Sequence, residues 1–355
     1  MAALQVRSQT IGNALNRDPG ESRAGAFVMS LDFELQWGVR DRVRLDANQK
    51  RRLILARSLV PRILDVFAKH DVKATWATVG ALFAESREHL EFFAPKNSSS
   101  DAMPLRSPPE ALGSSERDDP FHFAPSLIRL IAGCAGQEIG CHSFEHYCSL
   151  ETGQTHQQFQ ADLRSAVNIA AHHGVALKSY VFPRNQVNDA YLPLLTEEGF
   201  SCYRANEPGC LDAPGPFARQ RRWYKRVGRL ADSYLNVCGP RTHAWPPGNA
   251  SITAIGSSRY LRPLSPAFRA LEDLQFNRIL QSMGLAAERN QLFHLWWHPE
   301  GFADFPEMNL AFLSRVLAHF NALRDQYGMI SLTMHEVAST HVTFPAASRS
   351  SASHG

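Results

Sequence analysis

The chain has 355 residues, of which 44% are hydrophobic and 20% are charged, and this composition excludes a largely disordered protein. A net charge of +3 does not by itself indicate a nucleic-acid partner, and we expect none. No apolar run reaches the ~18–20 residues of a membrane helix. The first ten residues also lack the apolar segment of a signal peptide, so we expect a cytoplasmic protein.

Short apolar strand patterns alternate with helical patterns along most of the chain. Strands are expected at 25–31, 72–79, 137–141, 178–182, 201–204, 291–297 and 329–333. Helices are expected at 47–69, 125–135, 156–172, 188–198, 266–289 and 307–327. Repeated strand–helix–strand units predict a parallel α/β fold, and the length suits one barrel-like domain with extensions.

Three segments interrupt or flank this pattern. Residues 1–24 are polar and are expected to form a flexible N-terminal arm, and the Ser- and Ala-rich residues 341–355 a flexible tail. Residues 95–120 are rich in Pro and Ser and predict a long loop, either a lid over a site or a disordered insertion. One main domain is therefore expected over 25–340.

Two histidines four residues apart, His142 and His146, are the most informative pair. At this spacing both imidazoles can face one cation, and a carboxylate from a distant segment would complete a ligand triad with a position open for water. Taken alone, the pair is explained as well by a helix surface or a satisfied core as by a metal site. Because 137–141 reads as a strand, we expect the pair in a turn at the strand end.

Two carboxylates, Asp32 and Glu34, follow the first predicted strand. Carboxylates this close can divide their roles, one binding a metal and the other acting as general base. A solvated loop is the alternative, but the neighbouring Leu31, Phe33 and Leu35 favour a partly apolar setting.

His298 follows a very apolar strand. A histidine there can protonate a leaving group, or it can be a core residue bonded to backbone; His294, four residues earlier, is expected to be structural. In parallel α/β folds the active site lies at the carboxyl ends of the strands. Four polar residues follow separate predicted strands: Asp32, His142, Arg184 and His298.

The six cysteines form no Cys-x-x-Cys pair. Such a set predicts buried thiols in a reducing compartment. The alternative is a metal site made by Cys134, Cys141 and Cys148, which are spaced by seven residues.

Four ordered motifs resemble those of the polysaccharide deacetylases, the carbohydrate esterase family 4 group that includes chitooligosaccharide and peptidoglycan deacetylases. They are Ser30-Leu-Asp-Phe-Glu34, His142-Ser-Phe-Glu-His146, Phe182-Pro-Arg184 and Leu295-Trp-Trp-His-Pro299. The resemblance runs from about residue 25 to 335. It implies a distorted (β/α) barrel that uses a divalent metal, commonly zinc, to remove acetyl groups from N-acetylated sugars.

Carried onto this chain, the resemblance implies that Asp32 is the general base, that His142 and His146 are metal ligands, and that His298 is the general acid. Many members have two adjacent Asp residues in the first motif, where this chain has Asp32 and then Phe33. Glu34 is therefore our choice for the carboxylate ligand, with Asp32 as the alternative.

Further residues are expected to bind substrate. Trp296 and Trp297 are expected to wall a pocket for the acetyl methyl group. Many members have Arg two positions before the Pro of the third motif, where this chain has Val181, so Arg184 either reaches the Asp32 carboxylate from the other side or binds substrate. Sugar hydroxyls are expected to contact Arg204, Asn206 and Glu207. Asp232 is a candidate to orient His298, and structural roles are open for all of these.

A basic run with aromatic residues spans 219–229. It can bind the phosphate of a lipid-linked or nucleotide-linked sugar, touch an anionic membrane surface weakly, or be a solvated loop.

These observations predict a cytoplasmic, zinc-dependent deacetylase of an N-acetylated sugar or oligosaccharide, acting on a precursor of a cell-surface polysaccharide. One alternative is a hydrolase of another non-peptide C–N bond, in a small amide or ureide. The other is a non-catalytic carbohydrate-binding protein on the same fold, which the altered first motif favours.

Overall fold

The computed structural model describes residues 23–96, 112–207, 209, 215–216, 219, 222–235, 237–247 and 250–340, and of residue 226 the backbone only. The expected N-terminal arm and C-terminal tail, and most of the expected loop at 95–120, lie outside the described residues. Across the described helices, none combines the length and apolar character needed to cross a membrane.

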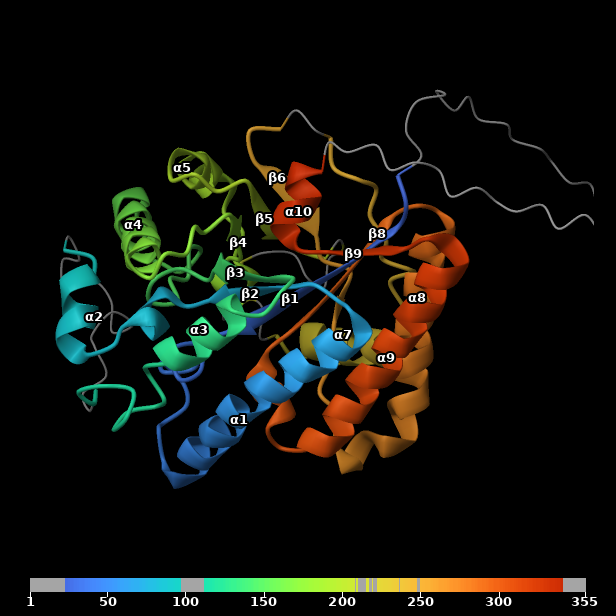
Figure 1. The fold of residues 1–355 in the computed structure, drawn as a ribbon, viewed down its shortest axis with the longest axis horizontal. Helices are drawn as coiled ribbons and strands as arrows, with labels where there is room; N and C mark the ends of the chain where they lie inside the picture. Colours follow the sequence, from blue (N-terminus) through green and yellow to red (C-terminus); the bar gives the residue numbers. More distant parts are fainter. Residues whose placement is uncertain are drawn as a thin grey trace, which may run out of the picture.

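A curled sheet of nine strands forms the centre of the molecule (Figure 1), and all pairings between its strands are parallel. Its strand order is β6-β5-β4-β3-β2-β1-β8-β7, with β9 also pairing with β1. The strands are β1 (Ala26–Phe33), β2 (Ala74–Thr78), β3 (Gln137–Cys141), β4 (Ser179–Tyr180), β5 (Cys202–Ala205), β6 (Thr253–Gly256), β7 (Arg259–Tyr260), β8 (Leu292–Trp297) and β9 (Ile330–Leu332).

One short segment joins the two edges of this sheet. β6 pairs with β5, and β7, which begins three residues after β6 ends, pairs with β8. Between them the Ser257 amide donates to the carbonyl of Ala205 at 3.0 Å, and the Ser258 amide donates to that of His294 at 2.9 Å. The segment therefore curls the sheet into a distorted barrel, and the predicted fold class is confirmed.

Helices surround the sheet, and Figure 1 shows α1, α9 and α8 lying beside one another. The α-helices are α1 (Ala47–His70), α2 (Arg87–Phe93), α3 (Pro125–Ala132), α4 (His156–His172), α5 (Leu192–Glu197), α7 (Trp223–Tyr234), α8 (Glu272–Glu288), α9 (Pro306–Tyr327) and α10 (Met334–Ser339). Short 3-10 helices lie at Gly80–Phe83, Pro183–Asn185, Asp189–Tyr191, Pro266–Leu271 and Pro299–Phe302. The six expected helices are present with shifted ends, whereas α2, α7, α10, β6 and β7 were not expected.

Local sequence sets the ends of the longer helices. Asp46 caps α1 by accepting a hydrogen bond from the Gln49 amide at 2.9 Å. Thr155 and Gln158 form a reciprocal capping box at the start of α4. These caps place the strand-to-helix loops, which carry the site described below.

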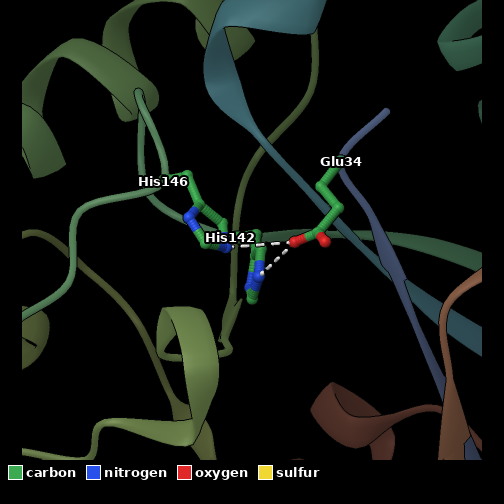
Figure 2. A group of neighbouring side chains, drawn as sticks. All are labelled: Glu34, His142 and His146. Carbon is green, nitrogen blue, oxygen red and sulfur yellow. Dashed lines mark ion pairs between the residues drawn. The ribbon is translucent and has the colours of Figure 1, made fainter. Parts of the chain in front are cut away.

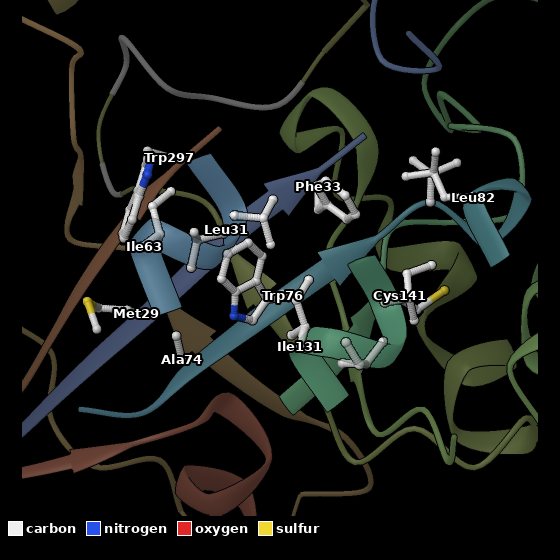
Figure 3. Close-up of a cluster of buried hydrophobic side chains, with 14 of the residues drawn as sticks. Met29, Leu31, Phe33, Ile63, Ala74, Trp76, Leu82, Ile131, Cys141 and Trp297 are labelled. Carbon is white, nitrogen blue, oxygen red and sulfur yellow. The ribbon is translucent and has the colours of Figure 1, made fainter. Parts of the chain in front are cut away.

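Alternation along the strands separates two apolar layers. On β1, residues such as Met29 and Leu31 belong to the larger core, which packs against the helices, and Figure 3 shows them near Ile63 of α1. The intervening residues, such as Val28, belong to a smaller cluster of side chains from opposite strands of the barrel, including Cys202. Successive side chains of a strand point to opposite faces, so every second residue of β1 enters the barrel interior.

Candidate functional site

Glu34, His142 and His146 converge at the carboxyl ends of β1 and β3, and we call them the ligand cluster. The Glu34 Oε2 atom lies 3.3 Å from His142 Nε2 and 3.1 Å from His146 Nε2. Dashed lines mark these two contacts in Figure 2. All three residues are buried, and their ligand atoms lie within 4.8 Å of one another. The expected convergence is therefore present, and cation binding by it stays a prediction.

The chemistry of the ligand cluster fits a divalent cation. The buried Glu34 Oε2 atom has no hydrogen-bond donor of acceptable geometry in the described part of the chain. Burial opposes ionisation of Glu34, but the imidazoles of His146 and His298 hold its pKa well below its ordinary value. Burial lowers the pKa of His146 to about 4. An ionised carboxylate facing neutral imidazoles is the form in which these groups bind metals.

The backbone fixes the orientation of His142. Its Nδ1 atom lies 2.9 Å from the carbonyl oxygen of Val181, the residue after β4. A carbonyl only accepts, so Nδ1 carries a proton, and Nε2 is the ring atom that faces Glu34. This is the orientation that a histidine needs to bind a metal through Nε2.

The loops of the site contain several residues with positive φ. They are Leu35 (φ 45°), Ser143 (φ 62°), His146 (φ 60°), Arg184 (φ 55°) and Asn185 (φ 52°). Such a conformation costs of order 1–3 kcal/mol at a residue other than glycine and persists only where surrounding contacts enforce it. The Leu35 amide, for example, donates to the buried carboxylate of Glu300 at 2.7 Å. We infer that these turns tolerate backbone strain because they position the side chains of the site.

Gly38 leaves room for the Glu34 carboxylate. A Cβ atom at position 38 would lie 2.0 Å from the Glu34 Cδ atom. No side chain can occupy that space while Glu34 keeps its place, so the glycine is part of the cradle of the ligand cluster.

Asp32 lies beside the ligand cluster and forms a buried ion pair with Arg204 of β5. Arg204 donates to both Asp32 oxygens, at 2.6 and 2.8 Å, and also to Ser30 Oγ at 3.1 Å. Burial alone would raise the pKa of Asp32, but the guanidinium of Arg204 and the imidazole of His142 hold it below its ordinary value. Both Asp32 oxygens are engaged, so the geometry favours Glu34 over Asp32 as the carboxylate ligand.

His298 follows β8 and faces both carboxylates. Its Nε2 atom lies 3.7 Å from Asp32 Oδ2 and 3.6 Å from Glu34 Oε1. A third of its side chain is exposed, in contrast to the buried ligand cluster. His294 is fully buried and lies within hydrogen-bond distance of Ser30 Oγ at 2.8 Å, as a structural residue would.

The two predicted arginines lie in different surroundings. Arg184 forms an ion pair with Asp41 and lines the same cavity as Asp32, so its expected roles, reaching Asp32 or binding substrate, stay predictions. Arg204 pairs with Asp32, so its predicted contact with sugar hydroxyls is wrong. The physical reason is strand alternation, because Arg204 points into the barrel toward β1, whereas Arg184 lies in a turn after β4.

The two predicted tryptophans face opposite sides of β8. Trp296 lies on the interior side, with the Arg204 guanidinium 4.3 Å from its ring centroid. Trp297 is fully buried in the outer core, with its ring 6.3 Å from that of Phe67 and 5.9 Å from that of Phe302. Figure 3 shows Trp297 among apolar side chains. Its predicted substrate contact is wrong, and the period of two in a strand would have revealed this.

Two adjoining cavities open beside these residues. One, of about 210 Å³, is lined by Asp32, Glu34, Arg42, His146, Arg184, Asn185, Trp296 and His298. The other, of about 280 Å³, shares Arg184, Asn185, Trp296 and His298, and extends past Asn206 and Glu207 to Arg229, Asp232, Ser233, Arg241, Ser257, Arg259, Tyr260 and Arg262. Asn206 and Glu207 are thus positioned as predicted for substrate contact, which stays a prediction.

Asp232 does not orient His298, contrary to our suggestion. Its Oδ2 atom lies 3.5 Å from Arg241 and 3.4 Å from Arg259, and its Oδ1 atom lies 3.5 Å from Arg278. Sequence reasoning missed Arg241, Arg259 and Arg278, because no local motif marks these dispersed residues.

The basic run at 219–229 lies partly in α7, which begins at Trp223. Trp223 is 76% exposed and Tyr224 is 46% exposed, whereas Arg229 lines the larger cavity. A plain loop is therefore excluded for most of the run, and its contacts with phosphate or membrane remain predictions.

The cysteines are not part of a metal site in the described residues, where the ligand cluster is the one group of potential ligands. Cys134, Cys141, Cys148, Cys202 and Cys238 are free thiols, although Cys134 and Cys238 are only partly buried. Cys210 lies outside the described residues.

Known proteins share sequence or fold with this chain. Residues 48–203 match the sequence model described as Polysaccharide deacetylase. No curated protein sequence matches the chain. A solved structure from Mycobacterium smegmatis, assigned to the polysaccharide deacetylases, has 15% identity and a TM-score of 0.56 over 91% of this chain and 92% of that chain.

Two further solved structures have similar folds. A Pseudomonas aeruginosa PAO1 protein with the same assignment has 12% identity and a TM-score of 0.50 over 88% of this chain and 89% of that chain. The allantoinase PuuE has 13% identity and a TM-score of 0.53 over 95% of this chain and 99% of that chain. Identities this low show the common fold alone.

The sequence match and the motifs agree in chain order. The matched segment contains His142, His146 and Arg184, and the barrel brings Asp32, Glu34 and His298, from outside that segment, to the same cavity. Residues 48–203 thus match the polysaccharide deacetylase model, which agrees with the resemblance seen in the motifs.

Proposed function

We propose that this protein is a metal-dependent hydrolase that removes an acetyl group from an N-acetylated sugar. The observation that carries the proposal is the arrangement of the ligand cluster, which faces the same cavity as Asp32 and His298. The match of residues 48–203 to the polysaccharide deacetylase model supports the reaction class.

The ligand cluster would hold the cation, which we propose is Zn²⁺, through the Glu34 carboxylate and the two imidazole Nε2 atoms. When bound, such a cation supplies Lewis acidity, which polarises the amide carbonyl and acidifies water. Every other part of the reaction falls to side chains of this chain.

Asp32 is the proton acceptor in this proposal. Its carboxylate is kept ionised and oriented by Arg204, so it can take a proton from the attacking water. His298 is the proton donor for the leaving amine. Its Nε2 atom lies 3.7 Å from Asp32, and its partial exposure lets it exchange protons with solvent between turnovers.

Trp296 supplies an apolar surface at the boundary of the two cavities. Its ring centroid lies 4.8 Å from that of Tyr260, so the two rings form one aromatic wall beside His298. We propose that this wall packs against the sugar ring or the acetyl methyl group, a contact that aromatic side chains make well.

The test is acetate release from a panel of N-acetylated sugars and oligosaccharides, with zinc supplied, for wild type and Asp32→Asn. Release by wild type and its loss in the variant would support the proposal. Cyclic ureides and small amides belong in the same panel, because hydrolysis of these alone would point to the other reaction class. Sugar binding without hydrolysis would point to a non-catalytic binding protein.

We also propose that the reaction takes place in the cytoplasm, on a precursor of a cell-surface polysaccharide. Cell fractionation with an antibody to the chain would test the location. Recovery outside the cytosolic fraction would contradict it without affecting the proposed chemistry.

A further inference from the structure

The larger cavity ends in a surface rich in arginine. Four residues, Arg229, Arg241, Arg259 and Arg262, line it on the side away from Asp32, and we call them the arginine wall. Arg229 comes from α7 and Arg259 from β7, while Arg241 and Arg262 come from the segments beyond them. The wall lies in the same cavity as His298 and Trp296, so a ligand there would extend directly into the catalytic site.

The positive charge of this cavity exceeds the negative charge among its described lining residues. Together with Arg184, five guanidinium groups line it against the two carboxylates of Glu207 and Asp232. Glu207 forms an ion pair with Arg241 and also accepts a hydrogen bond from Trp296 at 3.2 Å. The Asp232 carboxylate is shared among Arg241, Arg259 and Arg278.

Arg262 is the clearest source of excess charge. Its Nε atom donates to the Ser233 hydroxyl at 3.4 Å, and among the described residues no carboxylate lies within ion-pairing distance of its guanidinium. It is half-buried at the cavity surface. The Arg262 guanidinium in that position can bind an anion held in the cavity.

Crowding of like charges supports the same conclusion. Burial, together with the neighbouring charges of Arg259 and Arg278, lowers the pKa of Arg241 to about 10. Opposite charge brought into the cavity would relieve this repulsion, and it would act more strongly there than on an open surface.

We propose that the arginine wall binds the phosphate or diphosphate group of the substrate, and that the substrate is therefore an N-acylated sugar carrying such a group. This inference rests on the proposed function. Guanidinium groups bind phosphate oxygens through paired hydrogen bonds. A phosphate group therefore matches a wall of several arginines better than a neutral sugar does. A cavity of about 280 Å³ is close to the lower end of the ~300–1,000 Å³ range of small-ligand pockets.

The first test measures binding of inorganic pyrophosphate to the full chain by titration calorimetry. Hydrogen bonds to charged groups contribute roughly 1.5–3 kcal/mol, so Arg262→Gln should weaken binding about ten- to a hundredfold. The matched control, Arg289→Gln at an exposed position after α8, should bind like wild type. Raising the salt concentration should weaken wild-type binding.

Two results would overturn the inference: no pyrophosphate binding by wild type, or equal binding by wild type and Arg262→Gln. His142→Ala separates this test from that of the proposed function, because it should lose deacetylation and keep pyrophosphate affinity. Pyrophosphate binding can therefore be interpreted even if the protein proves not to be a deacetylase. Deacetylation can likewise be interpreted even if pyrophosphate does not bind.

The second test identifies the source of the phosphate. Binding to the His142→Ala chain is compared for an N-acetylhexosamine, its 1-phosphate, a nucleoside-diphosphate-linked form and a polyprenyl-diphosphate-linked form in micelles. The carrier is identified by the phosphorylated form that binds most tightly. Arg262→Gln should reduce the affinity for that form. Equal affinity for the unphosphorylated sugar would overturn the inference.

Discussion

The ligand cluster and the arginine wall adjoin the same pair of cavities but are built in different ways. The ligand cluster comes from two short motifs at the ends of β1 and β3, and its buried groups are a carboxylate with a lowered pKa and two imidazoles that face it. The arginine wall comes from residues scattered between 229 and 262, and its buried groups repel one another. In our proposals the first holds a cation and the second an anion.

This difference teaches that the two regions should be separable by experiment. Damage to the ligand cluster should reduce metal binding and leave phosphate binding intact, and damage to the arginine wall should do the reverse. Arg204 is an exception, since it anchors Asp32 from β5 and lies against Trp296, which lines both cavities.

Arg204→Met should have the largest effect. It leaves the buried Asp32 carboxylate without its counter-charge, so the free energy of unfolding should fall by about 3–5 kcal/mol. Without Arg204, burial should also raise the pKa of Asp32. Urea unfolding monitored by tryptophan fluorescence would measure the loss. Arg315→Met, which breaks the partly exposed ion pair with Glu272, should cost no more than about 1 kcal/mol.

Adding Asp32→Asn to Arg204→Met sharpens this prediction. The double variant removes both charges, so part of the lost stability should return while activity stays absent. Equal stability of Arg204→Met and wild type would show that the buried ion pair contributes little to the free energy of unfolding. Arg204 would then not couple the two regions.

His142→Ala should weaken zinc binding by more than about 100-fold, since loss of a mere hydrogen-bond partner of a metal ligand already costs about 10–100-fold. Zinc retained after dialysis, measured by atomic emission, would report this. His156→Ala, at an exposed position in α4, is the matched control and should retain zinc like wild type. Unchanged zinc content in His142→Ala would refute the ligand cluster.

Gly38→Ala tests the same region without removing a ligand. The new methyl group would overlap the Glu34 carboxyl group, so zinc affinity should fall about 10–100-fold, as for other changes that misplace a ligand. Gly284→Ala in α8, where no atom lies within 4 Å of the new Cβ, is the control. It should preserve zinc affinity and raise stability by roughly 0.5–1 kcal/mol. Identical zinc affinities for the two variants would contradict the role of Gly38 in leaving room for the Glu34 carboxylate.

Trp223→Ser should have the smallest effect. Trp223 is 76% exposed on α7, and such surface changes usually alter the free energy of unfolding by less than about 0.5 kcal/mol. Co-sedimentation with anionic vesicles would show whether this surface touches membranes. A loss of pyrophosphate affinity in this variant would extend the arginine wall onto the outer face of α7.

The sequence allowed much of the fold and half of the site to be predicted. Long periodic segments such as α4 and α9 and apolar strands such as β8 were found within a few residues. The strands β6 and β7, with four and two residues, were missed because such short segments carry no period. Trp297 was misplaced although the alternation of β8 contained the answer.

The sequence by itself determined the family resemblance, the fold class and the residues of the ligand cluster, because each depends on short motifs and on strand and helix periods. Only the tertiary structure decided which arginine pairs with Asp32, since Arg204 reaches it across the barrel. It also decided where the arginine wall lies. The segment from β6 to β7 closes the barrel and brings Arg259 and Arg262 to the catalytic cavity, and such a meeting depends on chain path and not on spacing.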